Sequence, residues 1–154
     1  MAIFRVKIIL FLWVCFAVSS ILATSVRYCD KKGKYAVKVK GVEMNPDPVV
    51  SGEEAKFKIS ATSGKSITGG EVTITVYFHG IFVHSEKIDL CQETPCPIAP
   101  GDFVLSHVQT LPGITPAGPY SLKMSISGND NELLTCIRFP FKIVRDSQAY
   151  VSEI

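Results

Sequence analysis

The chain lacks the sequence patterns that usually accompany catalysis. It has no G-x-S-x-G nucleophile elbow and no glycine-rich phosphate loop. Histidine occurs only 3 times, at His79, His84 and His107, and no third ligand stands near the first two at the spacing of a metal site. We therefore expect no catalytic residue, metal or cofactor, and exposed or hairpin positions for the histidines. A hydrolase with a dispersed Ser-His-Asp triad is the alternative.

Long apolar runs are absent after the first two dozen residues. Only Ile8–Val18 is nearly continuously apolar, and it is shorter than the roughly 20 residues that a transmembrane helix needs. Arg5 and Lys7 precede this run and small residues follow it around Ala23, which is the pattern of a secretory signal peptide. We expect residues 1–24 to be cleaved, with an uncleaved membrane anchor as the alternative. The protein would enter the secretory pathway and reach the extracellular space (apoplast) or a vacuolar or lysosomal lumen.

The sequence carries no excess of charge once this leader is removed. Its 16 Lys and Arg exceed its 14 Asp and Glu by two, and Arg5 and Lys7 of the leader account for that difference. A near-neutral protein lacks the electrostatic footprint of a nucleic-acid-binding domain. We therefore expect no nucleic-acid partner and no electrostatic attachment to an anionic membrane.

Four cysteines remain after the leader, because Cys15 lies within it. An even number in an oxidising compartment predicts two disulfides, which four cysteines can form in three ways. Cys91 and Cys96 flank a short loop and are expected to pair, which leaves Cys29 with Cys136. The chain-entropy model assigns about 2 kcal/mol to a six-residue loop and about 4.7 kcal/mol to a loop of roughly 100 residues. Zinc coordination is the alternative, although no second Cys or His pair stands at ligand spacing.

Apolar and polar residues alternate with a period of two along most of the remaining chain. The clearest runs are Tyr35–Lys40, Lys56–Ile59, Glu71–Phe78 and Tyr120–Ser127. Such alternation is typical of antiparallel strands with one buried and one solvent-facing side. Further strands are expected at Ile81–Leu90, Phe103–Leu111 and Leu133–Val144, the last of which is more uniformly apolar.

Turn-forming residues separate these runs. Proline, glycine, asparagine and aspartate cluster between them, and His79-Gly80 predicts a tight hairpin. No segment after the leader keeps a helical apolar period for three turns. Seven short strands predict one all-β domain over residues 25–146, an immunoglobulin-like two-sheet β-sandwich, with a barrel as the alternative. Residues 147–154 are expected to form a short C-terminal tail.

The strand pattern does not decide whether the interior of the sandwich is solid or hollow. The inward faces could pack solidly, or the sheets could separate around a ligand, since ligand sites are mostly apolar cavities of about 300–1,000 Å³. An empty hole of about 300 Å³ would cost about 7 kcal/mol at about 24 cal/mol per Å³. That cost rivals the whole stability of a typical domain, about 5–15 kcal/mol. A hollow protein would therefore depend on its disulfides and would normally be occupied.

Several short motifs occur in a characteristic order along the chain. They are Cys29, His79-Gly80-Ile81, Cys91-x4-Cys96-Pro97-Ile98, Leu111-Pro112 and the segment Leu134–Val144. In this order they resemble the ML family, the lipid-recognition domains related to myeloid differentiation factor 2, which include the sterol carrier lost in Niemann–Pick disease type C. The stretch Asn45–Glu53 resembles the plant members described as phosphatidylglycerol/phosphatidylinositol transfer proteins.

The resemblance implies that the two sheets enclose an apolar cavity for a lipid, with Cys29–Cys136 and Cys91–Cys96 bridges. It implies non-enzymatic binding and intermembrane transfer of a phospholipid or sterol by a monomer. Contact with membranes would be transient and would use apolar loop tips such as Ile67 and Ile114. The alternative is a secreted interaction module that recognises a protein or receptor, with or without a presented lipid. Strand parity and the family architecture together select as lipid-contacting residues Phe57, Ile59, Val76, Phe78, Leu122, Met124, Ile126, Ile137 and Phe139. Phe82, Ile114 and Tyr120 lie near turns and are expected to contact the lipid at the entrance.

Overall fold

The computed structural model describes residues 24–146, so the expected leader (apart from Thr24) and the expected tail lie outside the described residues. The described part is almost entirely β-structure. Its elements are β1 (Arg27–Tyr28), β2 (Val37–Asn45), β3 (Val49–Val50), β4 (Glu54–Ser63), β5 (Gly70–Phe78), β6 (Ile81–Asp89), α2 (Leu90–Glu93), β7 (Gly101–Thr110), β8 (Gly118–Gly128) and β9 (Leu133–Val144). No helix in this range is long and apolar enough to cross a bilayer.

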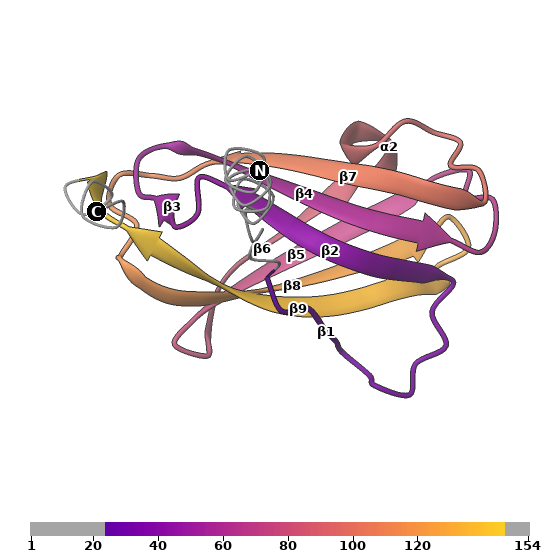
Figure 1. Cartoon of the computed structure of the whole chain (residues 1–154), viewed down its shortest axis with the longest axis horizontal. Coiled ribbons are helices and arrows are strands. Elements are labelled where there is room, and N and C mark those ends of the chain that lie inside the picture. Colours follow the sequence, from indigo (N-terminus) through magenta and orange to yellow (C-terminus); the bar gives the residue numbers. More distant parts are fainter. Residues whose placement is uncertain (1–23, 147–154) are drawn as a thin grey trace, which may run out of the picture.

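The strands form two layers that face each other (Figure 1). The larger sheet has the order β1-β9-β8-β5-β6, with β3 added in parallel to β9, and the smaller sheet has the order β2-β4-β7. The expected all-β two-sheet sandwich is confirmed, and the barrel alternative is wrong because the sheets are separate. Strands β6 and β7 are edge strands of different sheets, and α2 connects them along the chain.

The alternation seen in the sequence places one side of each strand in the interior. Strands β4 and β8 alternate buried and more exposed residues over nearly their whole length. Strand β9 is buried more uniformly, with Leu134–Ile137 all buried, and it pairs with β8 on one side and with β1 and β3 on the other. All seven expected strands are present, and β1 and β3 are two-residue additions at the edge.

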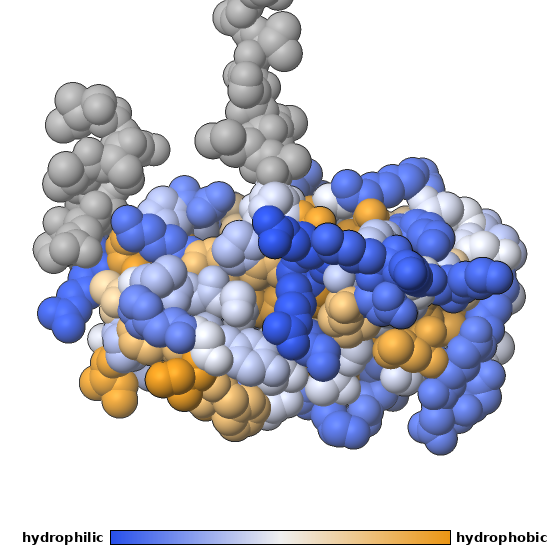
Figure 2. All heavy atoms as spheres, turned by 90° about the horizontal axis from the view of Figure 1, so that it is seen from below, coloured by the Kyte–Doolittle hydropathy of each residue, from blue (hydrophilic) through white to orange (hydrophobic). Residues whose placement is uncertain are grey.

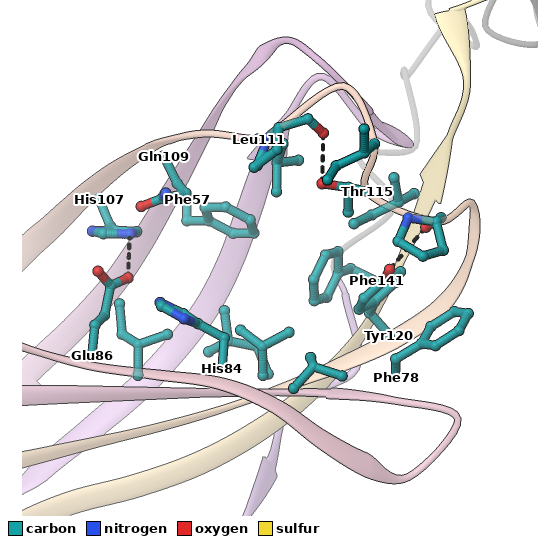
Figure 3. A pocket seen from close by; sticks show the side chains of 18 residues that line it. Phe57, Phe78, His84, Glu86, His107, Gln109, Leu111, Thr115, Tyr120 and Phe141 are labelled. Carbon is teal, nitrogen blue, oxygen red and sulfur yellow. Dashed lines mark hydrogen bonds and ion pairs between the residues drawn. The ribbon is translucent and has the colours of Figure 1, made fainter.

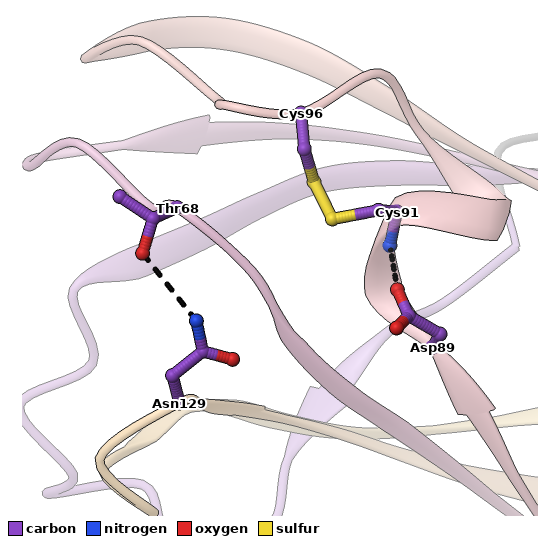
Figure 4. Close-up of a disulfide and its surroundings, with 5 residues drawn as sticks. All are labelled: Thr68, Asp89, Cys91, Cys96 and Asn129. Atoms are coloured by element: carbon purple, nitrogen blue, oxygen red, sulfur yellow. Dashed lines mark hydrogen bonds between the residues drawn. A yellow bond between two sulfur atoms is a disulfide. The ribbon is translucent and has the colours of Figure 1, made fainter.

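Both expected disulfides are present, so the zinc alternative is wrong. Cys29 and Cys136 are 107 residues apart and join the segment after β1 to β9. Cys91 and Cys96 close a short loop at α2, where the carboxylate of Asp89 accepts a hydrogen bond from the backbone N–H of Cys91 at 2.7 Å (Figure 4). This N-cap explains why β6 ends at Asp89 and a single helical turn follows.

The end of the sandwich next to α2 is closed by packed loops. Ile67 and Ile98 form an isolated backbone bridge, and both side chains are 4% exposed. Ile67 is therefore not an exposed loop tip, and that expectation was wrong. The position of Ile67 in a loop did not reveal that the loop containing Ile98 covers it. Leu90, the first residue of α2, is fully buried beside the same end.

Candidate functional site

The opposite end of the sandwich encloses a cavity of about 470 Å³ between the sheets (Figure 3). Its wall comes from β4, β5, β6, β7, β8, β9 and the loop between β7 and β8. The lining residues are Phe57, Ile74, Val76, Phe78, Val83, His84, Glu86, His107, Gln109, Leu111, Pro112, Ile114, Thr115, Pro116, Tyr120, Leu122, Phe141 and Ile143. The volume lies within the range of about 300–1,000 Å³ that is usual for small-molecule sites.

Aromatic rings form one end of this cavity. Phe78, Tyr120 and Phe141 stand together there in Figure 3, with ring centroids 4.7 Å apart for the first two and 5.5 Å for the last two. Phe57 reaches them from the other sheet, with its ring edge-on to Phe141 at 5.9 Å. Gly118 begins β8 at φ +148°, and a Cβ there would lie 2.9 Å from the Phe78 ring. A residue without a side chain is therefore needed to let β8 pass this aromatic group.

The mouth of the cavity is marked by the lining residues that solvent reaches. They come from two segments: Val83 and His84 of β6, and Pro112, Ile114 and Pro116 of the β7–β8 loop. Ile114 is 93% exposed, whereas Leu122 on the opposite wall is 5% exposed. The cavity thus opens between the start of β6 and this loop.

Side-chain hydrogen bonds, most of them partly buried, hold the loop at the mouth. The hydroxyl of Ser51, which is 9% exposed, lies 3.0 Å from the carbonyl oxygen of Gly113 and 3.1 Å from that of Thr115. Thr115 donates from its own hydroxyl to Pro112 O at 2.6 Å, and Tyr120 donates to Pro116 O at 2.8 Å. Burial raises the pKa of the Tyr120 hydroxyl, which favours the protonated form that donates this bond.

Removing the Ser51 hydroxyl is expected to loosen the mouth. In Ser51→Ala the partly buried loop carbonyls lose a donor, and a typical intramolecular hydrogen bond contributes about 0.5–1.5 kcal/mol. We expect exchange of a bound apolar probe, followed by stopped-flow fluorescence, to accelerate about 5-fold or more, since about 1 kcal/mol corresponds to that factor. Ser60→Ala, at a half-buried serine of β4, is the control. Equal exchange rates in both variants would contradict this role.

Polar side chains form the other end of the cavity. His84 and Glu86 of β6 stand there with His107 and Gln109 of β7 (Figure 3). His107 is 7% exposed, so the expectation of an exposed or hairpin position is wrong for this histidine. It is paired with Phe57 in the β4–β7 register, on the inward face, because β7 alternates His107 and Leu105 inward with Ser106 and Val108 outward.

Half of the expected lipid-contacting residues lie on the cavity wall. They are Phe57, Val76, Phe78, Ile114, Tyr120 and Leu122. Five others are buried in the packed part of the sandwich, away from the wall: Ile59, Met124, Ile126, Ile137 and Phe139. Parity selects the inward face of β4, β5, β8 and β9 correctly, but the two sheets separate at only one end of the sandwich.

Phe82 is the remaining expected residue, and a bulge explains its position. The β5–β6 register shifts between Val76 and Tyr77, which places Val83 opposite no partner. As a result Val83 and His84 both line the cavity, although they are consecutive. Phe82 pairs instead with Tyr77, and the centroids of their two rings are 6.4 Å apart. Phe82 is 59% exposed and lies off the wall.

Some wall residues were not anticipated from the sequence. Ile74, Phe141 and Ile143 share the parity of expected neighbours, and extending the alternating runs would have found them: by one step for Ile74 and Phe141 and by two for Ile143. Glu86 and Gln109 carried no signal, because polar residues on an inward face look like outward residues when a strand is considered alone. The loop residues Pro112, Thr115 and Pro116 required the tertiary structure.

The comparisons with known proteins agree with this geometry. A family model described as the ML domain matches residues 23–143. The MD-2-related lipid-recognition protein ROSY1 of Arabidopsis thaliana is 35% identical over 123 residues, covering 75% of this chain and 74% of that protein. A phosphatidylglycerol/phosphatidylinositol transfer protein of Aspergillus oryzae is 28% identical over 117 residues, covering 72% and 67%.

Solved structures share the fold at lower identity. A Niemann–Pick type C2 protein from the Japanese carpenter ant superposes with a TM-score of 0.63 at 16% identity, covering 78% of this chain and 99% of that one. Chicken MD-1 complexed with lipid IVa gives a TM-score of 0.52 at 18% identity, covering 76% and 86%. With the family model matched over nearly all described residues, the chain belongs to the ML domain family of lipid-recognition proteins.

Proposed function

We propose that this protein binds a lipid between its two sheets and transfers it between membranes without catalysing a reaction. The observation that carries the proposal is the cavity of about 470 Å³, lined mainly by apolar and aromatic side chains and open at one edge. Burial of a lipid tail yields about 0.8 kcal/mol per methylene group. A tail alone therefore supplies affinity without a charged clamp, and none of the described residues that line the cavity is Lys or Arg.

The proposed ligand is a phospholipid or a sterol, and the proposed setting is an oxidising compartment. Two disulfides support a protein that works outside the cell or in a vacuolar or lysosomal lumen. The names of the relatives support lipid transfer and recognition as the activity. A module that recognises a protein partner through a solid sandwich is the rival, and the cavity favours the carrier over it. We propose that the carrier is a monomer.

The decisive experiment is to ask what the purified protein carries and moves. Native mass spectrometry of protein from its own source is expected to show one bound lipid per chain. Donor vesicles with a fluorescent lipid should lose it to acceptor vesicles faster when the protein is present. Absence of stoichiometric lipid together with absence of transfer would overturn the proposed function.

Transfer requires contact with a membrane, and exposed apolar residues gather beside the mouth. Ile81 is 71% exposed, Phe82 59%, Val83 49% and Ile114 93%. Figure 2, which views the molecule of Figure 1 from below, shows apolar side chains gathered at the lower left, on the side of the β5–β6 hairpin. We propose that this rim enters the membrane interface, since apolar side chains can anchor a protein there without charge.

Ile81→Asp is therefore expected to slow vesicle-to-vesicle transfer about 10-fold, because burying one Ile side chain contributes about 1.5–3 kcal/mol. Ile81 does not line the cavity, so binding of an apolar probe in solution should be unchanged. The matched control is Leu133→Asp, which charges a 47% exposed apolar residue where β9 begins, opposite Ser127 near the far end of β8. Transfer rates that fall equally in both variants, or that fall steeply between low and physiological salt, would contradict apolar docking.

A further inference from the structure

The polar end of the cavity carries a negative charge that no neighbouring lysine or arginine compensates. Glu86 lies opposite Ile74 in the β5–β6 register, and Ile74 is buried on the cavity wall. The Glu86 side chain therefore faces the cavity, and it is 29% exposed. Among residues 24–146, no Lys or Arg nitrogen comes within 4.0 Å of its carboxylate, and Nε2 of the His107 imidazole lies 3.4 Å from it.

His107 is shared between two carboxylates. Its Nδ1 lies 3.2 Å from Oε2 of Glu93 in α2, and its side chain and that of Glu93 are 9% and 10% exposed. No hydrogen bond of good geometry reaches Nδ1 from the described residues. One imidazole can neutralise at most one of its two acidic neighbours. With both carboxylates ionised, the group formed by Glu86, His107 and Glu93 thus keeps at least one negative charge at the cavity.

Three other polar side chains on the wall, those of Thr115, Tyr120 and Gln109, donate hydrogen bonds within the protein. The hydroxyls of Thr115 and Tyr120 donate to carbonyl oxygens of the mouth loop, and the Gln109 amide donates to Thr110 O at 3.3 Å. The carboxylate of Glu86 is different, because it accepts hydrogen bonds only and its charge favours a donor. Glu86 is two residues along β6 from His84, which is exposed at the mouth. A ligand that enters tail first would leave its polar end near the mouth, and therefore near Glu86.

We propose that Glu86, positioned by His107, accepts a hydrogen bond from an uncharged hydroxyl at the polar end of the ligand. The cavity then selects lipid alcohols over the same lipids carrying an anionic phosphate. A phosphate at this position would face a like charge, and among residues 24–146 no Lys or Arg nitrogen lies within 4.0 Å of the Glu86 carboxylate to offset it. Repulsion between like charges is one way in which sites reject a competing ligand. The inference rests on the proposed lipid-binding function, and of the two ligand classes proposed there it favours a sterol or another lipid alcohol over a phospholipid.

A matched pair of single-chain lipids tests the inference: 1-palmitoylglycerol and 1-palmitoylglycerol-3-phosphate share a tail and differ by the phosphate. Each competes with the neutral probe N-phenyl-1-naphthylamine, at submicellar concentration and at pH 8, above the usual range of histidine titration. We expect the wild type to bind the alcohol at least about 10-fold more tightly, Glu86→Gln to reduce that ratio below about 3-fold, and Glu86→Lys to favour the phosphate.

The control is Glu43→Lys, which makes the same charge change at an exposed residue of β2 and should leave the ratio at its wild-type value. Equal affinities in the wild type, tighter binding of the phosphate, or the same ratio in Glu86→Gln as in the wild type would overturn the inference. In those cases the probe is still bound and lipid binding stands. Failure of wild-type protein to bind the probe and both lipids would overturn the proposed function together with the inference.

Discussion

Val76→Trp is expected to weaken binding of an apolar probe or a lipid tail at least about 100-fold while the protein stays folded. Val76 is half-buried on the cavity wall, between Leu122 on β8 and His84 on β6. An indole at this position would occupy space that the tail needs. Displacing about four methylene groups at about 0.8 kcal/mol each removes about 3 kcal/mol of binding free energy.

The same substitution in a packed core would strain it by about 1–3 kcal/mol, but here the added volume enters a cavity. We therefore expect the midpoint of denaturant unfolding of the lipid-free protein to be unchanged or raised. Thr75→Trp is the control, because Thr75 is the preceding residue of β5 and points to the outer face beside Ser85. Tight binding by Val76→Trp, or an equal loss in Thr75→Trp, would show that lipid does not occupy this cavity.

Loss of the long disulfide is expected to have the largest effect on stability. The chain-entropy model assigns about 4.7 kcal/mol to a loop of roughly 100 residues, and Cys29 and Cys136 are 107 residues apart. The variant with both residues changed to alanine should lose that amount of unfolding free energy, measured by urea denaturation. The loss is a large fraction of the about 5–15 kcal/mol that typical domains possess.

The short disulfide supplies the comparison. Replacing Cys91 and Cys96 by alanine opens a loop with a separation of only 5 residues, so about 2 kcal/mol should be lost. Both pairs of substitutions remove one bridge, and the difference between them isolates the effect of loop length. If the two variants lost equal free energy, the bridge between β1 and β9 would not stabilise the sandwich by constraining the unfolded chain.

Local patterns predicted the strands well because their cause is local. The alternation in Glu71–Phe78 and Tyr120–Ser127 reflects successive side chains pointing to opposite faces, which depends on no distant residue. The His79-Gly80 hairpin was predictable for the same reason. Its two central residues have φ of +49° and +81°, as the favoured two-residue turn requires.

The candidate site was predictable only in part, because its extent depends on how far apart the sheets lie. Leu122 and Met124 have the same parity on β8, yet Leu122 lines the cavity and Met124 is packed at 2% exposure. No property of the β8 sequence separates them. The difference arises from the residues opposite, which close the end next to α2 and leave the mouth end open.

The polar end of the site separates most clearly what the sequence predicts from what only the tertiary structure shows. By itself, the sequence predicted an all-β domain with two disulfides and the inward face of most of its strands. Only the tertiary structure decided that β6 and β7 are adjacent edges of different sheets, which brings Glu86 to His107 across the cavity. The physical reason is that periodicity is a property of one strand, whereas a cavity and its charge are properties of the space between strands distant in sequence.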